Sequence, residues 1–257
     1  MSEALLEAGA QAVDLDCGEP IVRLRALAPR GADVAALIAR AAAVLGVAAP
    51  GYRVEPLEDA DWVRRSQAQF GPIAIAGGLW IVPSWRASPG PDAATVRIDP
   101  GLAFGTGGHA TTRLALEWLV RSVRAGRSVL DYGCGSGILA IAAARLGAGE
   151  VAAVDNDPQA LECAAENARA NGVALTLAAP DALPARTYDL IVANILAAPL
   201  IALEPEFAAR ARAGGRIALS GLLEPQGEAL AAAYAARFDL AVGARQEGWV
   251  LLEGARR

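Results

Sequence analysis

A glycine-rich loop and a downstream aspartate are the residues best suited to hold a cofactor. The loop spans residues 131–137, with the sequence DYGCGSG, and it joins a short apolar segment at 128–130 to a helical pattern at 138–146. Glycine has no Cβ and accepts positive φ angles, so such a loop lets the backbone approach a ligand closely. The next apolar segment, 151–154, leads directly to Asp155. At the carboxyl edge of a parallel sheet this carboxylate can accept both hydroxyl groups of a ribose. Together these features predict a nucleoside-containing cofactor.

The spacing of the glycines distinguishes between cofactor types. Gly133, Gly135 and Gly137 form G-x-G-x-G, whereas dinucleotide-binding loops have G-x-G-x-x-G. No lysine follows to form a phosphate-binding loop, since the chain contains no lysine at all. With Asp131 in front, D-x-G-x-G-x-G resembles motif I of the class I S-adenosylmethionine-dependent methyltransferases. The resemblance implies S-adenosylmethionine as the cofactor and places Asp131 near its methionine end. A dinucleotide-dependent oxidoreductase is the alternative that the spacing disfavours.

Composition and charge restrict the substrate. With 257 residues, of which 54% are hydrophobic and 20% charged, the chain can form one large domain and a small one. The net charge of −5 argues against a naked nucleic acid as a direct partner, because binding phosphates needs a basic face. A basic protein would suit an acidic enzyme better.

Cysteine and histidine are too sparse for a structural zinc site. The three cysteines, Cys17, Cys134 and Cys163, form no C-x-x-C pair, and His109 is the single histidine. With so few ligands we expect no bound metal. Nothing indicates a disulfide framework, so we expect a cytoplasmic location. The acidic N-terminus lacks the basic region of a signal peptide, and no apolar run is long enough to span a bilayer. We therefore expect no membrane partner, and we expect a monomer.

Strand and helix patterns alternate from residue 128 onward, which predicts a parallel sheet with helices on both faces. The expected strands lie at 128–131, 151–155, near 175, at 188–193, at 215–220, near 240 and at 249–252. The expected helices lie at 112–123, 138–146, 158–171, from 199, and at 225–237. The last two strands have no helix between them, so we expect an antiparallel pair at one edge. The fold class is α/β, with a Rossmann-like seven-stranded class I methyltransferase domain and a small N-terminal α/β domain.

Three regions are expected along the chain. Residues 1–57 form the small domain, with a strand at 21–27, a helix at 33–45 and a returning strand at 52–55. Residues 58–70 are polar and helix-like and form a linker. Residues 71–257 form the catalytic domain, which begins with two strand-like pieces at 79–82 and 95–98.

A second stretch is more specific than the glycine loop. Residues 99–112, DPGLAFGTGGHATT, closely resemble the bacterial family of methyltransferases that modify large-subunit ribosomal protein eleven. Segments within 61–85, 131–158 and 192–196 agree with the same family in order and spacing. The resemblance implies a protein N-methyltransferase that trimethylates amino groups, on lysine side chains or the N-terminal amine, of this ribosomal protein. It also implies that the N-terminal domain holds the substrate, although residues 1–57 match no motif of the family.

Within this stretch, a flap and a helix start are expected to border the site. Phe104, Gly105, Thr106 and Gly107 are expected to form a mobile flap next to the substrate, because closely spaced glycines leave little to hold it. His109 is a candidate catalytic residue, and its alternatives are packing or capping.

Thr111 and Thr112 begin the next helix. The resemblance places a threonine here in contact with the cofactor, Thr112 being the expected contact, and the alternative is that they only cap the helix. Gly133 and Gly135 are expected to bring backbone amides to the cofactor. The alternative for Asp155 is to cap the helix that starts at 158.

Asn194 is the residue expected nearest the reacting atoms. It ends the apolar strand 190–193 at the carboxyl edge, where ligands bind, and its amide can accept a hydrogen bond from an attacking amine and donate one to the cofactor. The alternative is a turn residue that caps the following helix. Many amino-methyltransferases have N-P-P-Y here, whereas this chain has Asn194-Ile195-Leu196, without an aromatic clamp for a planar base. That difference disfavours a nucleic-acid base as substrate. Other substrates of a class I methyltransferase, and a non-catalytic cofactor-binding module, remain as alternatives.

Overall fold

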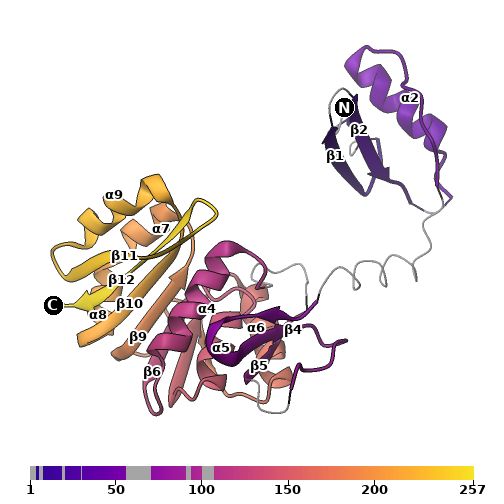
Figure 1. Ribbon diagram of the computed structural model, residues 1–257. Coiled ribbons are helices and arrows are strands. Elements are labelled where there is room, and N and C mark those ends of the chain that lie inside the picture. Colours follow the sequence, from indigo (N-terminus) through magenta and orange to yellow (C-terminus); the bar gives the residue numbers. More distant parts are fainter. Residues whose placement is uncertain are drawn as a thin grey trace. The chain divides into compact units, whose positions relative to one another are not determined.

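The computed structural model describes residues 4–5, 8–18, 21–29, 31–55, 71–90, 94–99 and 107–257 (Figure 1). The chain divides into two compact units, Met1–Arg64 and Arg65–Arg257. The predicted boundary at 57 and the whole of the predicted linker, 58–70, fall in the stretch 56–70, which lies outside the described residues.

The N-terminal unit is a two-stranded sheet with one long helix. Strand β1 (Ala12–Gly18) pairs antiparallel with β2 (Ile21–Leu27), and helix α2 (Val34–Leu45) follows. The carboxylate of Asp33 begins α2 by accepting a hydrogen bond from the Ala36 amide at 3.0 Å, and Gly46 ends it at a φ of 64°. The small core of this unit consists of Ala4, Leu5, Ala10, Leu37, Ile38 and Ala41.

Two details of this unit differ from the prediction. The strand partner of β2 is β1, which the sequence analysis did not predict. The returning strand predicted at 52–55 is wrong, because residues 51–55 form no strand. Tyr52 and Val54 are both more than half exposed, so the alternation in that segment does not mark a buried face.

The larger unit, Arg65–Arg257, is built on the seven-stranded sheet that the sequence predicted. Its strand order is β11-β12-β10-β9-β6-β7-β8. All strands are parallel except β12, which lies between the edge strand β11 and β10 and runs antiparallel to both. The strands are β6 (Ser128–Tyr132), β7 (Glu150–Val154), β8 (Thr176–Ala178), β9 (Tyr188–Asn194), β10 (Ala211–Leu223), β11 (Phe238–Gln246) and β12 (Trp249–Arg256). Strands β7 and β8 lie on one side of β6 and β9 lies on the other, so the chain reverses its direction of travel at β6. Ligands bind at such a reversal, outside the carboxyl ends of the strands.

Helices cover both faces of this sheet (Figure 1). One core joins it to α4 (Ala110–Ser122), α5 (Ile138–Arg145) and α6 (Pro158–Ala170). The other core joins it to α7 (Ala197–Ala202), α8 (Glu204–Arg210) and α9 (Glu224–Tyr234). Side chains of the strands alternate between the two cores, as Val129 and Leu130 do, which is the period of a sheet buried on both faces.

A second, three-stranded sheet extends the first of these cores. Strand β3 (Ile73–Ala74) leads through the turn η1 (Ala76–Gly78) to β4 (Leu79–Val82), and β5 (Ala94–Arg97) pairs parallel with β4. Leu79, Ile81 and Val96 are buried against α4 and α5. The two strand-like pieces of the sequence are therefore confirmed, and they form a sheet that leads the chain into α4.

Helix α4 is fixed to the sheet by a polar network. The indole nitrogen of Trp118 donates to Glu253 Oε2 at 2.8 Å, and Arg216 and Arg121 form ion pairs with the same carboxylate at 2.7 and 3.0 Å.

Among the described elements, none is a helix long and apolar enough to cross a bilayer.

Candidate functional site

The glycine loop between β6 and α5 is held in a turn that only glycine adopts easily. Gly133 and Gly137 have φ angles of 78° and 77°, in the left-handed region. A Cβ added at Gly133 would lie 2.3 Å from Ile195 Cγ2, so a side chain there would strike the segment after Asn194. The amides of Gly133 and Cys134 donate to Val154 O at 2.7 and 2.9 Å. The loop is thus bound to the end of β7, beside Asp155.

Asp155 follows the carboxyl end of β7 directly, and its side chain organises the loop. Its Oδ2 accepts a hydrogen bond from the Gly135 amide at 2.9 Å, and its Oδ1 accepts one from the Asp157 amide at 3.1 Å. The N-cap of α6 is Asp157, whose carboxylate accepts from the Gln159 amide at 2.9 Å. The capping alternative for Asp155 is therefore wrong. Each of its oxygens keeps a lone pair with which to accept a hydroxyl group.

Asp131 is enclosed beneath the loop. It is fully buried, its Oδ2 accepts from the Ala140 amide at 3.0 Å, and its Oδ1 has no hydrogen-bond partner among the described residues. Burial raises the pKa of this carboxyl to about 7, with a further contribution from the negative charge of Asp155, although the Ala140 hydrogen bond opposes the shift. The side chain bonds to the first turns of α5, and its predicted proximity to the methionine end of the cofactor stays a prediction.

This buried carboxyl should make stability depend on pH. Its pKa is about 7 in the folded protein, above its ordinary value of 3.8. Between these values the folded state keeps a proton that the unfolded state has lost, so stability falls as pH rises. Asp131→Asn removes the titration. The difference in free energy of unfolding, variant minus wild type, should therefore increase with pH. The increase should be up to about 1.4 kcal/mol per pH unit between about pH 4 and 7, and the difference should then level off. Urea unfolding of both proteins across this range measures the difference, and a difference independent of pH would contradict the assignment.

The start of α4 is organised by His109. The imidazole Nδ1 accepts from the Thr111 amide at 3.3 Å as the N-cap of α4, and Thr111 Oγ1 lies 2.8 Å from the same nitrogen. The ring packs edge-on against Trp249, with centroids 5.0 Å apart. The capping and packing alternatives for His109 are therefore both present in the structure. Neither Thr111 nor Thr112 is the N-cap.

Asn194 lies at the carboxyl end of β9, and Thr112 holds its side chain. Asn194 Nδ2 donates to Thr112 Oγ1 at 3.2 Å, which links the start of α4 to the centre of the sheet. Its Oδ1 accepts no hydrogen bond from the described part of the chain, so it can receive one from a substrate. Helix α7 begins after Leu196, without a side-chain cap, so the capping alternative for Asn194 is wrong.

Two residues that the sequence analysis missed support this arrangement. Ser220 Oγ donates to Thr111 O at 2.9 Å, and both groups are buried. Gly221 has a φ of 88°, and an added Cβ would lie 2.2 Å from the backbone oxygen of Ile195. Ser220 pairs with Asn194 across β10 and β9, so the available signal was a serine–glycine pair at the end of the strand predicted at 215–220.

The predicted flap is described only in part. Phe104, Gly105 and Thr106 lie outside the described residues. Gly107 is buried at a φ of 86°, and a Cβ there would lie 3.1 Å from Ile81 and 3.4 Å from Ile138. At this position glycine permits close packing between β4 and the start of α5.

The charge of the site suits a cationic ligand. Asp155 is close enough to Asp131 for its negative charge to contribute to the raised pKa of Asp131. Burial raises the pKa of the Cys134 thiol, so this residue stays protonated and is no nucleophile. In the described part of the chain, no group of three or more His, Cys, Asp or Glu residues could hold a metal ion. A cofactor with a nucleoside and a positively charged sulfonium fits the glycine loop and Asp155, whereas a pyrophosphate would meet the Asp155 carboxylate.

Comparison with known proteins identifies the family. The family model described as ribosomal protein L11 methyltransferase (PrmA) matches residues 2–257. The chain belongs to this family. A ribosomal protein L11 methyltransferase of Burkholderia multivorans is 46% identical over 280 residues, which cover 100% of this chain and 93% of the relative. Another, from Cupriavidus necator, is 50% identical over 235 residues, or 91% of this chain and 78% of the relative.

Solved structures agree with membership of the L11 methyltransferase family. The ribosomal protein L11 methylase of Lactobacillus delbrueckii subsp. bulgaricus has a TM-score of 0.66 at 35% identity, covering 73% of this chain and 100% of that one. The 16S rRNA N2 G1207 methyltransferase of T. thermophilus, solved with AdoMet and guanosine, has a TM-score of 0.50 at 26% identity, covering 60% and 45%. The class I methyltransferase fold predicted from the sequence is confirmed, and the chain is a methyltransferase. The family is named for the activity that the sequence resemblance predicted.

Proposed function

We propose that this protein transfers methyl groups from S-adenosylmethionine to amino groups of ribosomal protein L11, on lysine side chains, the N-terminal amine or both. The observation that carries the proposal is the Asn194 side chain, held by Thr112 at the end of β9 directly beside the glycine loop. The Asn194 Oδ1 is available to an incoming amine there. The enzyme works as a cytoplasmic monomer without direct contact to nucleic acid.

The residues of the loop bind and orient the cofactor. Gly133 and Gly135 let the backbone approach it, and Asp155 accepts hydrogen bonds from its ribose hydroxyls. The cofactor supplies a methyl group on a sulfonium, which is already an activated leaving group. The protein therefore needs no acid at the methyl, and its main task is to align the amine nitrogen with the methyl carbon and sulfur.

The amine must be neutral to attack. For a lysine with a pKa of about 10.4, losing the proton near neutral pH costs about 4 kcal/mol, from about 1.4 kcal/mol per pH unit. Asn194 Oδ1 accepts a hydrogen bond from the neutral amine and fixes its direction. His109 uses Nδ1 to cap α4, which supports a positioning role rather than that of a general base. Asp131 is enclosed and does not reach the substrate.

Asp155→Ala should weaken cofactor binding strongly. The substitution removes the ribose acceptor and frees the Gly135 amide. The Kd for S-adenosylmethionine should rise by roughly 10- to 150-fold, which corresponds to about 1.5–3 kcal/mol for hydrogen bonds to a charged group. Asp157→Ala is the matched control, since it removes a carboxylate two residues away that only caps α6. Calorimetry compares the two, and equal affinities for Asp155→Ala and wild type would reject the ribose assignment.

The function is tested by incubating the purified protein with labelled S-adenosylmethionine and total ribosomal protein. The label should enter one protein, which mass analysis should identify as L11 carrying added methyl groups on amines. Label in ribosomal RNA or in a different protein, with L11 unmodified, would overturn the proposal. Wild-type cofactor binding without any transfer would favour the non-catalytic module.

A further inference from the structure

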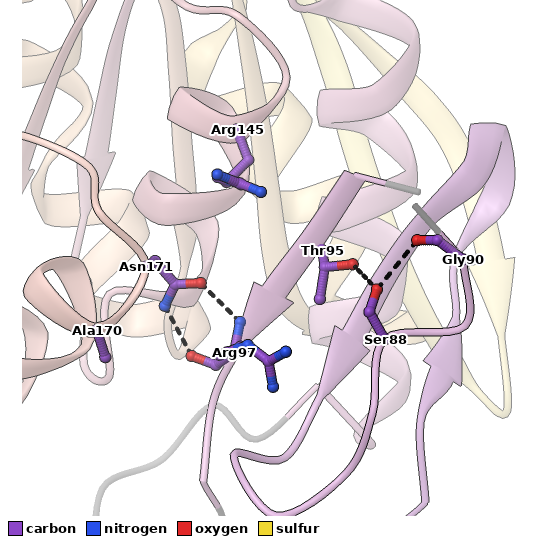
Figure 2. A pocket seen from close by; sticks show the side chains of 7 residues that line it. All are labelled: Ser88, Gly90, Thr95, Arg97, Arg145, Ala170 and Asn171. Carbon is purple, nitrogen blue, oxygen red and sulfur yellow. Dashed lines mark hydrogen bonds between the residues drawn. The ribbon is translucent and has the colours of Figure 1, made fainter. Parts of the chain in front are cut away.

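Helix α6 carries two asparagines whose role the proposed function does not explain. Asn167 lies in its last turn and Asn171 is its C-cap, and their side-chain amides reach two different segments. Asn167 Nδ2 donates to Ser136 O in the glycine loop at 2.8 Å. Asn171 Oδ1 accepts from the Arg97 amide at 2.7 Å, and its Nδ2 donates to Arg97 O at 2.8 Å (Figure 2).

Asn171 substitutes for a neighbouring strand. It binds both backbone groups of a single residue at the end of β5, as a partner in a ladder would, while β4 pairs with the other side of β5. It is largely buried, and its Nδ2 also donates to Asn167 O at 2.8 Å. The two asparagines thus form one connected network from the glycine loop to Arg97. Removing the Asn171 amide would leave the backbone groups of Arg97 without these partners.

The strand that Asn171 holds precedes, in the chain, the start of α4, where Thr112 contacts Asn194. We call this part of the site the substrate side. Nine residues, 98–106, join Arg97 to Gly107, after which His109 caps α4 and Thr112 holds Asn194. Asp99 is fixed as well, since its carboxylate accepts from Ser84 N and Ser84 Oγ at 2.6 and 2.7 Å. The exit of β5 is therefore fixed from two sides.

The cavity beside this network is not by itself a ligand site. Its volume is about 260 Å³, and Arg97 and Arg145 contribute positive charge to its lining (Figure 2). Arg145 stands in the last turn of α5, where a positive charge complements the helix dipole. We therefore base the inference on the side-chain amides of Asn167 and Asn171 and not on the cavity.

We infer that Asn167 and Asn171 are positioning residues for methyl transfer. Asn167 fixes the cofactor loop, Asn171 fixes the strand that leads to the substrate side, and one rigid helix holds both. Their geometry keeps the amine and the methyl group in line, which is the main source of rate in such a displacement. This inference rests on the proposed function, because its readout is transfer to L11.

The test uses the full-length protein well below its melting temperature. Asn171→Ala should lower kcat for L11 by about 10- to 100-fold, the scale of a misplacement of roughly 1 Å, while the Kd for S-adenosylmethionine stays near wild type. Asn167→Ala should instead raise that Kd, by about 5-fold for one hydrogen bond. Tyr234→Phe is the matched control, since it removes one buried hydrogen bond, to Leu200 O at 2.6 Å, in the other core. It should lower stability and leave kcat unchanged.

Asn171→Asp is the second variant, because it keeps an acceptor for the Arg97 amide and loses the donors. It should give an intermediate kcat, and it decides the question if Asn171→Ala does not fold. Unchanged kcat in the Asn171 variants, with only a melting temperature as low as that of Tyr234→Phe, would overturn the inference. Failure of the wild type to methylate L11 would instead count against the proposed function.

Discussion

Asn194→Ala should lower kcat for methyl transfer by about 100-fold or more, because a misplaced amine loses the alignment that drives an in-line displacement. The variant removes the Oδ1 that we propose accepts a hydrogen bond from the amine, and it removes the Nδ2 hydrogen bond to Thr112. The Kd for S-adenosylmethionine should change much less, since the glycine loop and Asp155 are untouched. Single-turnover transfer to L11, with calorimetry for the cofactor, separates these two quantities.

Variants of Thr112 provide the control. Thr112→Val keeps the shape of the side chain and removes the acceptor of the Asn194 hydrogen bond, so it should lower kcat by less than Asn194→Ala does. Thr112→Ser keeps the hydroxyl group and should stay closest to wild type. A wild-type kcat for Asn194→Ala would show that the amide does not orient the amine. If Asn194→Ala raised the Kd for S-adenosylmethionine by the same factor by which it lowered kcat, Asn194 would be chiefly a cofactor ligand.

The sheet was predictable because burial on two faces leaves a clear pattern. The central strands β6, β7 and β9 are short apolar runs, and the helices between them repeat apolar residues at helical spacing. The loop and Asp155 were predictable for a related reason, since both follow strands whose carboxyl ends share one edge. Periodicity reports which side chains are buried, and the parallel topology follows from the alternation of strands and helices.

Helix caps were predicted less well, because a cap depends on the exact first residue of a helix. Asp155 and Asp157 are both acidic residues before Pro158, and only the backbone geometry shows that Asp157 is the cap. The same holds for His109, which caps α4 although two threonines follow it. If a helix boundary is predicted one or two residues away from its true position, a residue that only caps the helix can be mistaken for one that binds a ligand, and the reverse.

Contacts between distant segments could not be predicted from one sequence. Strand β1 depends on pairing with β2, and alternation alone made 52–55 resemble a strand that has no partner. Gly221 must be glycine because the backbone of Ile195 leaves no room for a Cβ. Asn171 binds the backbone of Arg97, which is 74 residues away in the chain. Such residues are polar or small, as loop residues also are, so their types alone do not mark them.

Deleting residues 1–57 should abolish most transfer to L11 and preserve the catalytic unit. The described residues of the N-terminal unit have their own small core, whereas the described residues of both cores around the seven-stranded sheet all lie at position 73 or later. Cofactor affinity should therefore remain near wild type, since Gly135, Asp155 and Asn194 all lie in the catalytic unit. We propose that the deleted unit holds the substrate protein, so kcat/KM for L11 should fall by at least about 100-fold when positioning is lost.

The deletion separates the two units only if the remaining chain folds. Circular dichroism should show a cooperative transition, and calorimetry should show S-adenosylmethionine binding at close to wild-type affinity. Loss of cofactor binding in a soluble truncated protein would mean that the boundary at 57 is misplaced or that the units fold together. Wild-type methylation of L11 by the folded fragment would show that residues 1–57 do not hold the substrate, and recognition would then lie in the catalytic unit beside Asn194.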